Sequence, residues 1–542
     1  MRIQKDVTPG AASFFKIRIM KKFLPALVVL LCASCTQGWD ALNKQAAQEY
    51  LEPFRTDVPW NNFAKKFIYA PAFHFDEVQN AESYVFTLTP EDGEALSFEA
   101  SSPSAPLTPV WDKLPAGKQI ELTVDALASD RKVILRVGER SFLKDFPFEG
   151  PYPGPACDYK EAALKGALYI HTMPEIQHWS TSVEPDMDYP HNTYPCKIIS
   201  ATVRNECLIA SLLPERRENA LAIARGAAQF LIDQSRPEGD PLAYFPPTYY
   251  LDKEASKRDW NKGKTMTLEA ASAGQAFLDL YDTTGEKEWL DRAVAIGRTY
   301  IKLQHEDGSL PIKVDFVTGE PVNEVCAMLH PLLRYYKRLE GYGFGEFLPY
   351  RIKGEEWMNS TAVKVFNMTG QFEDVNVKDL ELYQNLTNCT AAPYATYLLK
   401  KAAPTKDDLR NAEDLIRLSE DQFVHWAYPE RTADGFFLRY TPCVHEQYRY
   451  EMPVDNSACN VANAWLDYYE VTGDLLALAK AKAMIDNITR MQNPVNGKIP
   501  TTWEWRDARK DRNRTFWVNC SFSSIQMLLR ADGLKDAFEK LP

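Results

Sequence analysis

The sequence predicts a mainly α-helical protein: an (α/α)6 toroid, which is a closed ring of six helical hairpins, preceded by a small β-sandwich domain. Amphipathic helical patterns dominate from residue 155 to the end of the chain, and they contain an internal repeat. Short alternating segments over 56–150 are typical of strands, and a proline-rich linker at 150–155 separates the two patterns. The roughly 390 residues beyond the linker suffice for about a dozen helices of ordinary length.

The first 35 residues have the pattern of an export signal. The basic pair Lys21 and Lys22 precedes an apolar run over 23–31, and small residues lead to Cys35. This order resembles a bacterial lipoprotein signal, with Cys35 as the lipidated residue and residues 1–19 as an extension from a misplaced start codon. We therefore expect an exported protein, lipid-anchored in the cell envelope of a Gram-negative bacterium, whose only membrane contact is this anchor.

Residues 36–55 are expected to form a tether, and the β domain to follow over 56–150. Residues alternate between apolar and polar over 83–89, 120–124 and 133–137, and proline- and glycine-bearing turns separate these segments. This spacing predicts a small sandwich. The segment 75–84 looks like the opening of a fibronectin-III-like module, which we expect to serve as a spacer or brace.

The helical part, 155–542, repeats itself. One copy runs from Gly285 to Gln304 and another from Gly473 to Gln492, with the same interval between glycine and glutamine. A looser copy covers 220–234. Each of the two closer copies continues into a glycine-bearing turn and a proline, which predicts stacked hairpins.

An open α-solenoid is the alternative to a closed ring. A solenoid should show a more uniform repeat and shorter connections. Here the connections are long and rich in aromatic and acidic residues, and long structured loops in a compact domain are usually functional. They cover 171–200, 241–263, 341–385 and 427–456. The ring is therefore favoured, with its loops around one mouth.

Charge and composition exclude several functions. The net charge of −12 argues against a nucleic-acid partner. The cysteines beyond Cys35 are scattered without the paired spacing of metal ligands. His171 and His178 with Glu175 suggest a metal site, but Pro174 interrupts any helix that would align them. We therefore expect a sugar-binding loop here, and neither a metal nor a cofactor; a structural calcium in the stretch 184–188 is the weaker alternative.

Several other loops and helices carry residue types suited to sugar recognition. Aromatic rings stack on the apolar faces of pyranose rings, arginine matches a carboxylate with paired donors, and apolar walls raise the pKa of a carboxyl group. Packing or a mutual salt bridge is the competing explanation for each. The candidates are Arg204, Glu206, Tyr249, Glu324, Trp503, Glu504 and Trp505.

The stretch 442–460 concentrates more such residues than any other. It lies just before a strongly helical segment, and loops held by rigid helices are where catalytic groups gather. It contains His445, Glu446, Tyr448, Arg449 and Asp455. We expect it to form one wall of an active site.

Motifs between 420 and 520 resemble the C-terminal half of six-hairpin, glycosidase-like proteins of bacterial polysaccharide utilisation. They include 420–426, 444–448, 453–457, 472–474, 497–500 and 517–520. Within that group the chain is most similar to glycoside hydrolase family 154. The resemblance implies an exo-acting β-glucuronidase. The superfamily also holds unsaturated glucuronyl hydrolases, polysaccharide lyases and uronate C5-epimerases, so the fold does not fix the reaction.

Hydrolysis of a glycosidic bond needs two carboxyl groups. We expect Glu446 to be the general acid, and Asp455 or a glutamate of another hairpin to be its partner, with Glu206, Glu324 and Glu504 as the further candidates. Arg204 and Arg449, with Tyr448 and His445, are expected to hold the carboxylate of a uronic acid at the end of an oligosaccharide.

Two alternatives stay open. In a lyase or C5-epimerase, Tyr448 or His445 would abstract the proton at C5 of the uronate. A non-catalytic surface lipoprotein would bind glycans on shallow aromatic platforms without turnover. The many acids in the loops favour an enzyme.

Overall fold

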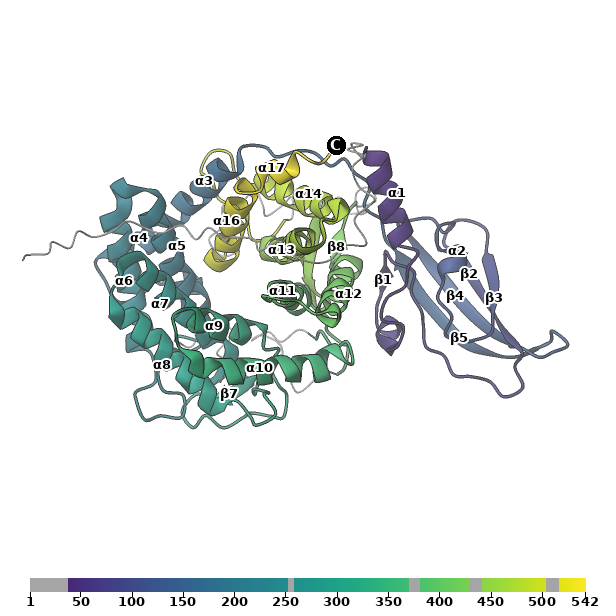
Figure 1. Ribbon diagram of the computed structural model, residues 1–542, viewed down its shortest axis with the longest axis horizontal. Helices are drawn as coiled ribbons and strands as arrows, with labels where there is room; N and C mark the ends of the chain where they lie inside the picture. The colour runs from purple at the N-terminus through teal and green to yellow at the C-terminus, as the bar shows by residue number, and fades with distance from the viewer. Residues whose placement is uncertain (1–37, 252–257, 370–380, 428–440, 504–515) are drawn as a thin grey trace, which may run out of the picture.

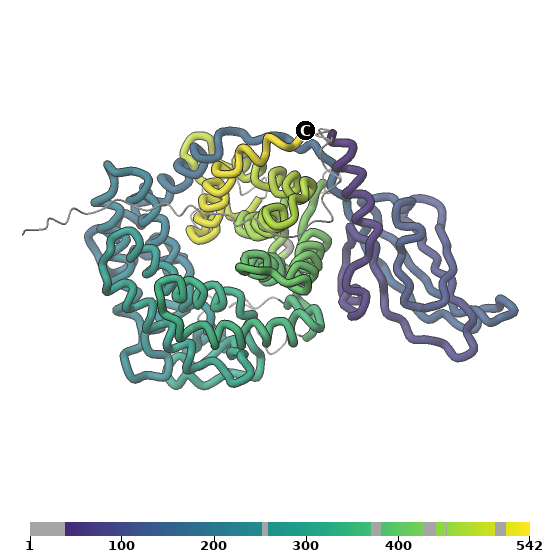
Figure 2. Tube along the Cα trace, viewed as in Figure 1, coloured from purple at the N-terminus to yellow at the C-terminus, as the bar shows by residue number. Residues whose placement is uncertain are grey.

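The computed structural model describes residues 38–251, 258–369, 381–427, 441–503 and 516–542. Figure 1 shows a ring of helices with a β domain on its outside and the helix α1 between the two, and Figure 2 shows the same course as a tube. Within the described ranges, no helix is long and apolar enough to cross a membrane. The predicted signal and Cys35 lie outside the described residues.

The β domain is one five-stranded sheet in the order β1-β5-β4-β2-β3. Only β1 and β5 pair in parallel, and the other pairs are antiparallel. The domain comprises α1 (Trp39–Glu49), β1 (Lys66–Phe67), β2 (Ser83–Pro90), β3 (Leu96–Ala100), α2 (Thr108–Trp111), β4 (Lys118–Leu127) and β5 (Val133–Lys144).

The expected β-sandwich is not seen in this domain. Strands β2, β4 and β5 cover the three segments that the alternation predicted, but residues 56–150, all of which are described, form a single sheet. Aromatic side chains cover the inner face in place of a second sheet: Trp111, Phe67 and Phe73 pack on Phe142, with ring centroids 5.5–6.1 Å apart. The alternation of apolar and polar residues along a strand shows that one face of the sheet is buried, but it does not show whether a second sheet or other side chains cover that face.

The ring consists, in the described part of the chain, of six inner helices, each packed on an outer one. The inner helices are α5 (Ser200–Leu212), α7 (Ala270–Thr284), α9 (His330–Gly341), α11 (Asn388–Leu399), α13 (Asp455–Thr472) and α16 (Val518–Asp532). The outer helices are α6 (Arg217–Asp233), α8 (Lys287–Leu303), α10 (Leu348–Trp357), α12 (Lys406–Phe423), α14 (Leu475–Met491) and α3 (Tyr159–Thr172).

The two ends of the helical part close this ring. The last inner helix, α16, packs on the first outer helix, α3, and also contacts the first inner helix, α5. An open solenoid would leave these helices apart, so the described helices agree with the predicted toroid. Short elements connect the hairpins: α4 (Pro174–Gln177), β6 (Lys264–Met266), β7 (Lys313–Asp315), β8 (Val424–His425), β9 (Cys443–Gln447) and β10 (Tyr450–Pro453). The short helix α17 (Lys535–Phe538) follows the last inner helix.

The two glutamines of the repeat join neighbouring outer helices. The Gln304 amide, after α8, donates to the carbonyls of Gly308 (2.8 Å) and of Tyr350 on α10 (3.0 Å). After α14, the Gln492 amide donates in the same way to Gly497 (2.7 Å) and to α3 (2.9 Å). Both turn glycines have positive φ and lie against the backbone of the next helix, where a side chain would not fit. The repeated glycine and glutamine positions are therefore explained by contacts between neighbouring outer helices of the ring.

The motif at 420–426 holds the β domain against the ring. The Glu420 carboxylate on α12 accepts hydrogen bonds from the hydroxyls of Tyr50 (2.6 Å) and Tyr69 (2.9 Å), and it pairs with Lys480 on α14 (2.9 Å). Asp421 accepts from two backbone N–H groups of the β domain, those of Ile68 and Tyr69. These carboxylates are buried in the interface, so this part of the motif has a structural role.

Asp145 forms a second link across the same interface. Its carboxylate contacts Lys66 Nζ at 2.8 Å and the ring of His425 at 3.0 Å. Burial alone would raise the pKa of Asp145, but these two partners outweigh it and hold the pKa below its ordinary value. The charged form is therefore favoured in the folded protein.

We expect this link to fail in acid. A depressed folded pKa contributes stability above the unfolded value of about 4 and loses it as the pH falls below that value. The free energy of unfolding of the wild type should thus fall between pH 5 and pH 2, and one such group accounts for at most about 1.4 kcal/mol per pH unit. Denaturant titrations at several pH values should give a shallower fall in Asp145→Asn. Parallel curves would exclude this role.

Candidate active site

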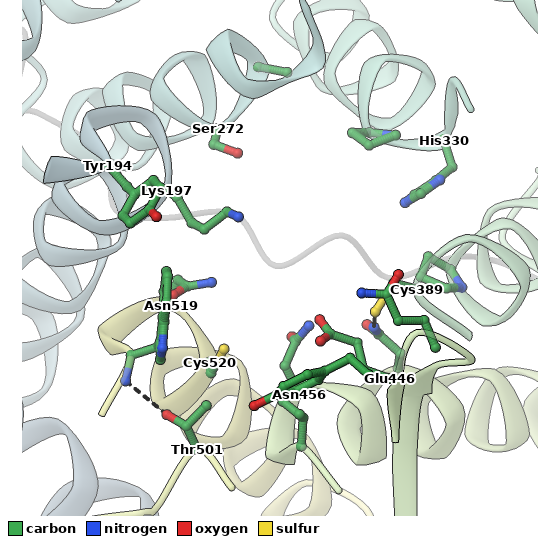
Figure 3. A pocket seen from close by; sticks show the side chains of 18 of the residues that line it. Tyr194, Lys197, Ser272, His330, Cys389, Glu446, Asn456, Thr501, Asn519 and Cys520 are labelled. Atoms are coloured by element: carbon green, nitrogen blue, oxygen red, sulfur yellow. Dashed lines mark hydrogen bonds between the residues drawn. The ribbon is translucent and has the colours of Figure 1, made fainter. Parts of the chain in front are cut away.

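A cavity of about 660 Å³ opens in the middle of the ring. Most of its lining side chains lie in the first two turns of the six inner helices, on the turn Pro195–Ile199 before α5, and on β9 and β10, and connecting segments supply the rest. Figure 3 shows Lys197, His330 and Glu446 reaching into the same open space from three different elements. The lining includes Lys197, Arg204, Ser272, His330, Arg334, Cys389, Glu446, Asn456, Trp517 and Cys520.

Glu446 is the single carboxylate that lines the cavity among the described residues. It lies on β9, which pairs with β8 and β10. Its own carbonyl accepts hydrogen bonds from the Thr387 hydroxyl (2.8 Å) and the Asn388 amide (3.0 Å), at the start of α11. These bonds fix the backbone, so the side chain is presented from a rigid support.

Positive charge dominates the rest of the lining. In the part of the lining that the structure describes there are four cations, namely Lys197, Arg204, Arg258 and Arg334. The N-termini of the inner helices add partial positive charge, because their first backbone N–H groups have no partner within the helix. The overall charge of the chain is negative, so the cavity is a local exception. Such a site favours an anionic ligand.

Neutral groups complete the polar lining. Burial, with Arg334 nearby, lowers the pKa of His330 to about 3, so its imidazole is uncharged at neutral pH. Burial, with the nearby charge of Glu446, raises the pKa of the Cys389 thiol to about 12. The pKa of Cys520 is also raised, mainly by burial. Neither thiol is therefore a thiolate nucleophile at neutral pH.

An aromatic wall stands at one side of the cavity. The Trp517 ring stacks on His191 at 4.0 Å between centroids and lies 5.3 Å from the ring of Tyr194. Lys197 Nζ lies 5.9 Å from the centroids of both aromatic rings. Flat aromatic faces beside a cation suit a pyranose ring that carries a negative group.

Trp517→Ala is expected to weaken oligosaccharide binding about 10-fold, or about 1.4 kcal/mol, because the sugar loses a stacking surface. Calorimetric titration with a glucuronate-terminated oligosaccharide measures the change. Trp357→Ala on α10, which does not line the cavity, is the matched control. Equal binding by wild type and Trp517→Ala would place the sugar elsewhere.

Three of the residues predicted around Glu446 do not line the cavity. The His445 ring lies 4.3 Å from that of His425, towards the β domain. The Tyr448 hydroxyl donates to the side chain of Gln422. Exposed Arg449 donates to Gln384 at 2.9 Å. Alternation along β9 turns His445 away where Glu446 turns in, and the turn after β9 carries the other two out.

Asp455 also lies behind the wall, although its neighbour Asn456 lines the cavity. It is fully buried at the start of α13 and accepts hydrogen bonds from the Ser524 hydroxyl (3.0 Å) and the Asn456 N–H (2.8 Å). Burial raises its pKa well above the ordinary value. This arrangement supports α13 and does not supply the cavity with a second carboxylate.

Glu206 and His171 form a buried pair between α5 and α3. The His171 Nδ1 and a Glu206 oxygen are 2.6 Å apart, and the Asn205 amide donates to the other oxygen at 3.0 Å. Both side chains are at most 1% exposed. The pair satisfies itself inside the protein and leaves nothing for a ligand.

The remaining candidates divide into three groups. Arg204 lines the cavity, but its guanidinium is paired with Asp279 at 2.7 Å. Tyr249 stands behind the lining residue Tyr194, with ring centroids 6.1 Å apart. His178, Glu324 and the buried Trp503 do not line the cavity, and Glu504 and Trp505 lie outside the described residues.

The sequence interpretation missed several cavity residues, among them Lys197, His330 and Arg334. A signal for two of them is present in the segment of α9, where His330, Arg334 and Arg338 recur every four residues between apolar side chains. This spacing places them on one face of a helix. In the described ranges, no group of three or more His, Cys, Asp or Glu side chains is arranged to hold a metal ion.

No protein-family model and no curated protein sequence matches this chain. Solved structures with a similar course of the chain include a family 76 glycoside hydrolase from a bovine Bacteroides thetaiotaomicron strain. Its identity is 10% and its TM-score 0.46, over 84% of this chain and 93% of that one.

Two others are the cellobiose 2-epimerase of Spirochaeta thermophila and an unsaturated glucuronyl hydrolase specific for heparin. Each is 11% identical over 70% of this chain and 98% of its own, with TM-scores of 0.48 and 0.44. These proteins catalyse different reactions on carbohydrates. We therefore base the functional proposal on the cavity itself.

Proposed function

We propose that the protein is a carbohydrate-active enzyme that removes a terminal uronic acid from an oligosaccharide by hydrolysis. The observation that carries this proposal is a cation-rich cavity with one carboxylate, Glu446, among its described lining residues. A uronide supplies both a negative group for the cations and a glycosidic oxygen for the acid. The motifs that resemble glycoside hydrolase family 154 point to the same substrate class, a β-glucuronide.

The dimensions of the site favour exo-action. A volume of about 660 Å³ is in the range of pockets that enclose one small ligand. Trp517 offers a flat surface for the sugar ring, and the helix N-termini together with the cations offer an environment for its carboxylate. The chain end would enter the ring, and the remainder of the oligosaccharide would stay outside.

In this mechanism Glu446 protonates the oxygen that leaves with the rest of the oligosaccharide. A second carboxyl group then activates water or attacks the anomeric carbon. Asp455 is unsuited to this role because it is buried behind the wall. Glu504 stays the sequence-based candidate and lies outside the described residues.

A lyase or C5-epimerase is the second candidate, and the same single carboxylate favours it. Abstraction of the C5 proton needs one base and a cation that stabilises the charge on the uronate carboxylate. Glu446 would be the base in this scheme, in place of Tyr448 or His445. A protein that binds without turnover is the third possibility.

The products distinguish the three. We expect the full-length protein to release free uronic acid from glucuronate-capped oligosaccharides, without the ultraviolet absorbance of an unsaturated uronate. A rise in that absorbance would support a lyase, and exchange of the C5 hydrogen with solvent deuterium would support an epimerase. Binding without any product would support a glycan-binding protein.

We further propose that the protein is exported and lipid-anchored through Cys35, as the signal-like N-terminus suggests. Metabolic labelling with a fatty-acid analogue tests this, with Cys35→Ser as the control. Labelling that persists in Cys35→Ser would contradict the assignment.

A further inference from the structure

We infer that Arg334, together with His330 one turn before it, forms an anion-binding subsite that receives the acidic substituent of the substrate. The inference rests on the proposed function and names the residue that selects the substrate. The sequence had suggested Arg204 and Arg449 for this role.

Among the described lining residues, Arg334 is a cation that is available for a ligand. It lies on the inner helix α9 and is accessible from the cavity, although it is deep inside the ring. It makes no hydrogen bond, ion pair or ring contact with any residue that the structure describes. By contrast, Arg204 pairs with Asp279 and also lies 5.1 Å from the ring centroid of Phe522.

The local charges leave an excess of positive charge at Arg334. One oxygen of Asp279 contacts Arg204 at 2.7 Å, and the other contacts Arg338 at 2.6 Å. Arg338 takes a further carboxylate, Asp282, at 2.9 Å. A third carboxylate, Asp467 on α13, raises the pKa of Arg334 but is itself paired with Arg530 (2.5 Å) and Lys400 (3.2 Å). Each of these three carboxylates is therefore occupied by another cation.

The Arg334 side chain is exposed to the cavity, and a guanidinium that has no protein partner there can bind an anion with its paired donors. Burial within the ring and the charge of Arg204 lower the pKa of Arg334, while the charge of Asp467 raises it. Arginine nevertheless stays protonated. A bound anion would place negative charge beside Arg334 and offset its repulsion by Arg204.

His330 adds a neutral polar group beside the guanidinium. Its Nδ1 is buried and has no hydrogen-bond partner among the described residues. The ring points into the cavity in Figure 3. Because the imidazole is uncharged, it can donate one hydrogen bond to an anion without adding a second positive charge to the subsite.

The chemistry of the subsite fits a carboxylate or a sulfate. The guanidinium fork donates two parallel hydrogen bonds to either group. Glu446 reaches the cavity from β9 and His330 from α9 (Figure 3). A sugar anchored at Arg334 by its acidic group can thus present its glycosidic oxygen to Glu446.

The test is binding of monosaccharides to the full-length Glu446→Gln variant, which removes turnover from the measurement. Calorimetric titration with D-glucuronate, D-glucose 6-sulfate and D-glucose reports the selectivity. We expect the glucuronate affinity to exceed that for glucose, and Arg334→Gln in the same background to weaken glucuronate about 100-fold, as for a lost charge-assisted pair. Glucose should bind equally before and after the change.

Arg334→Lys and Arg298→Gln are the companion variants. Lysine keeps the charge without the fork, so it should retain an intermediate affinity. Arg298 on α8 is exposed and pairs with Glu346, so Arg298→Gln should bind like the parent. Circular dichroism and the melting temperature of each variant check that it folds. A sulfate-selective loss in Arg334→Gln would assign the subsite to sulfated sugars.

Different experimental outcomes would contradict the anion-binding subsite and the proposed hydrolase function. Uronate hydrolysis by the wild type with an unchanged KM and unchanged glucuronate affinity in Arg334→Gln would overturn the subsite and keep the function. Arg334-dependent glucuronate binding without any turnover by the wild type would overturn the hydrolase and keep the subsite. Equal losses for glucuronate and glucose would also overturn the subsite.

Discussion

Glu446→Gln is expected to lower kcat for uronide hydrolysis by about 1000-fold, the scale on which a positioned general acid accelerates such a reaction. Glutamine has the same shape but cannot give up a proton. Because the backbone of Glu446 is held by Thr387 and Asn388, the substitution should leave the wall in place. Steady-state kinetics with a glucuronate-capped oligosaccharide should therefore show the loss in kcat, while calorimetry still detects binding.

Glu324→Gln is the matched control for this variant. The sequence made Glu324 a candidate acid, but it does not line the cavity, so its removal should leave kcat within about 2-fold. Leaving-group dependence adds a further check: activated aryl glucuronides need less protonation and should recover part of the lost rate in Glu446→Gln. Full activity of Glu446→Gln on natural substrates would remove Glu446 from the mechanism.

The architecture was accessible from the sequence because its signals are local. The interval from Gly285 to Gln304 recurs from Gly473 to Gln492 since each spans one outer helix of 17 residues with its two ends. The glycines adopt positive φ, and the glutamines bond to the next outer helix. Short-range geometry of this kind leaves its mark on the residue types. By contrast, the covering of the β-sheet by aromatic side chains depends on segments that are distant in the sequence, so no local pattern of residues predicted it.

The candidate site was only partly accessible, because the direction of a side chain is set by tertiary packing. Alternation on β9 separates His445 from Glu446, but the sequence does not say which of the two faces the cavity. The sequence also does not show which charged residues form ion pairs with one another. Arg204 looked like a ligand group until Asp279, 75 positions later, proved to be its partner. Arg334 carried no distinguishing motif beyond its four-residue spacing from His330.

Glu420→Gln is expected to destabilise the folded protein by about 3–5 kcal/mol, the cost of breaking a buried ion pair by removing one partner. The Glu420 side chain is 1% exposed, and that of Lys480 is 3% exposed. Four donors converge on this carboxylate: the hydroxyls of Tyr50 and Tyr69, the Trp426 indole N–H at 3.0 Å, and Lys480. In Glu420→Gln, the amide N–H group of glutamine would face hydrogen-bond donors and could not accept from them. Lys480 would keep only one of its two carboxylate partners, Glu49, at 3.5 Å.

Chemical denaturation measures this loss of stability, and two further variants serve as its controls. Glu413→Gln on the same helix removes a partly exposed partner of Arg417 and should cost less than about 1 kcal/mol. Lys480→Met combined with Glu420→Gln should be more stable than the sum of the single changes, because no buried charge is then left unpaired. Additive effects, or a change below 1 kcal/mol in Glu420→Gln, would show that the β domain is held to the ring by its apolar contacts. In the expected case the acidic motif at 420–421 has an interface role, and the catalytic role is confined to the cavity around Glu446.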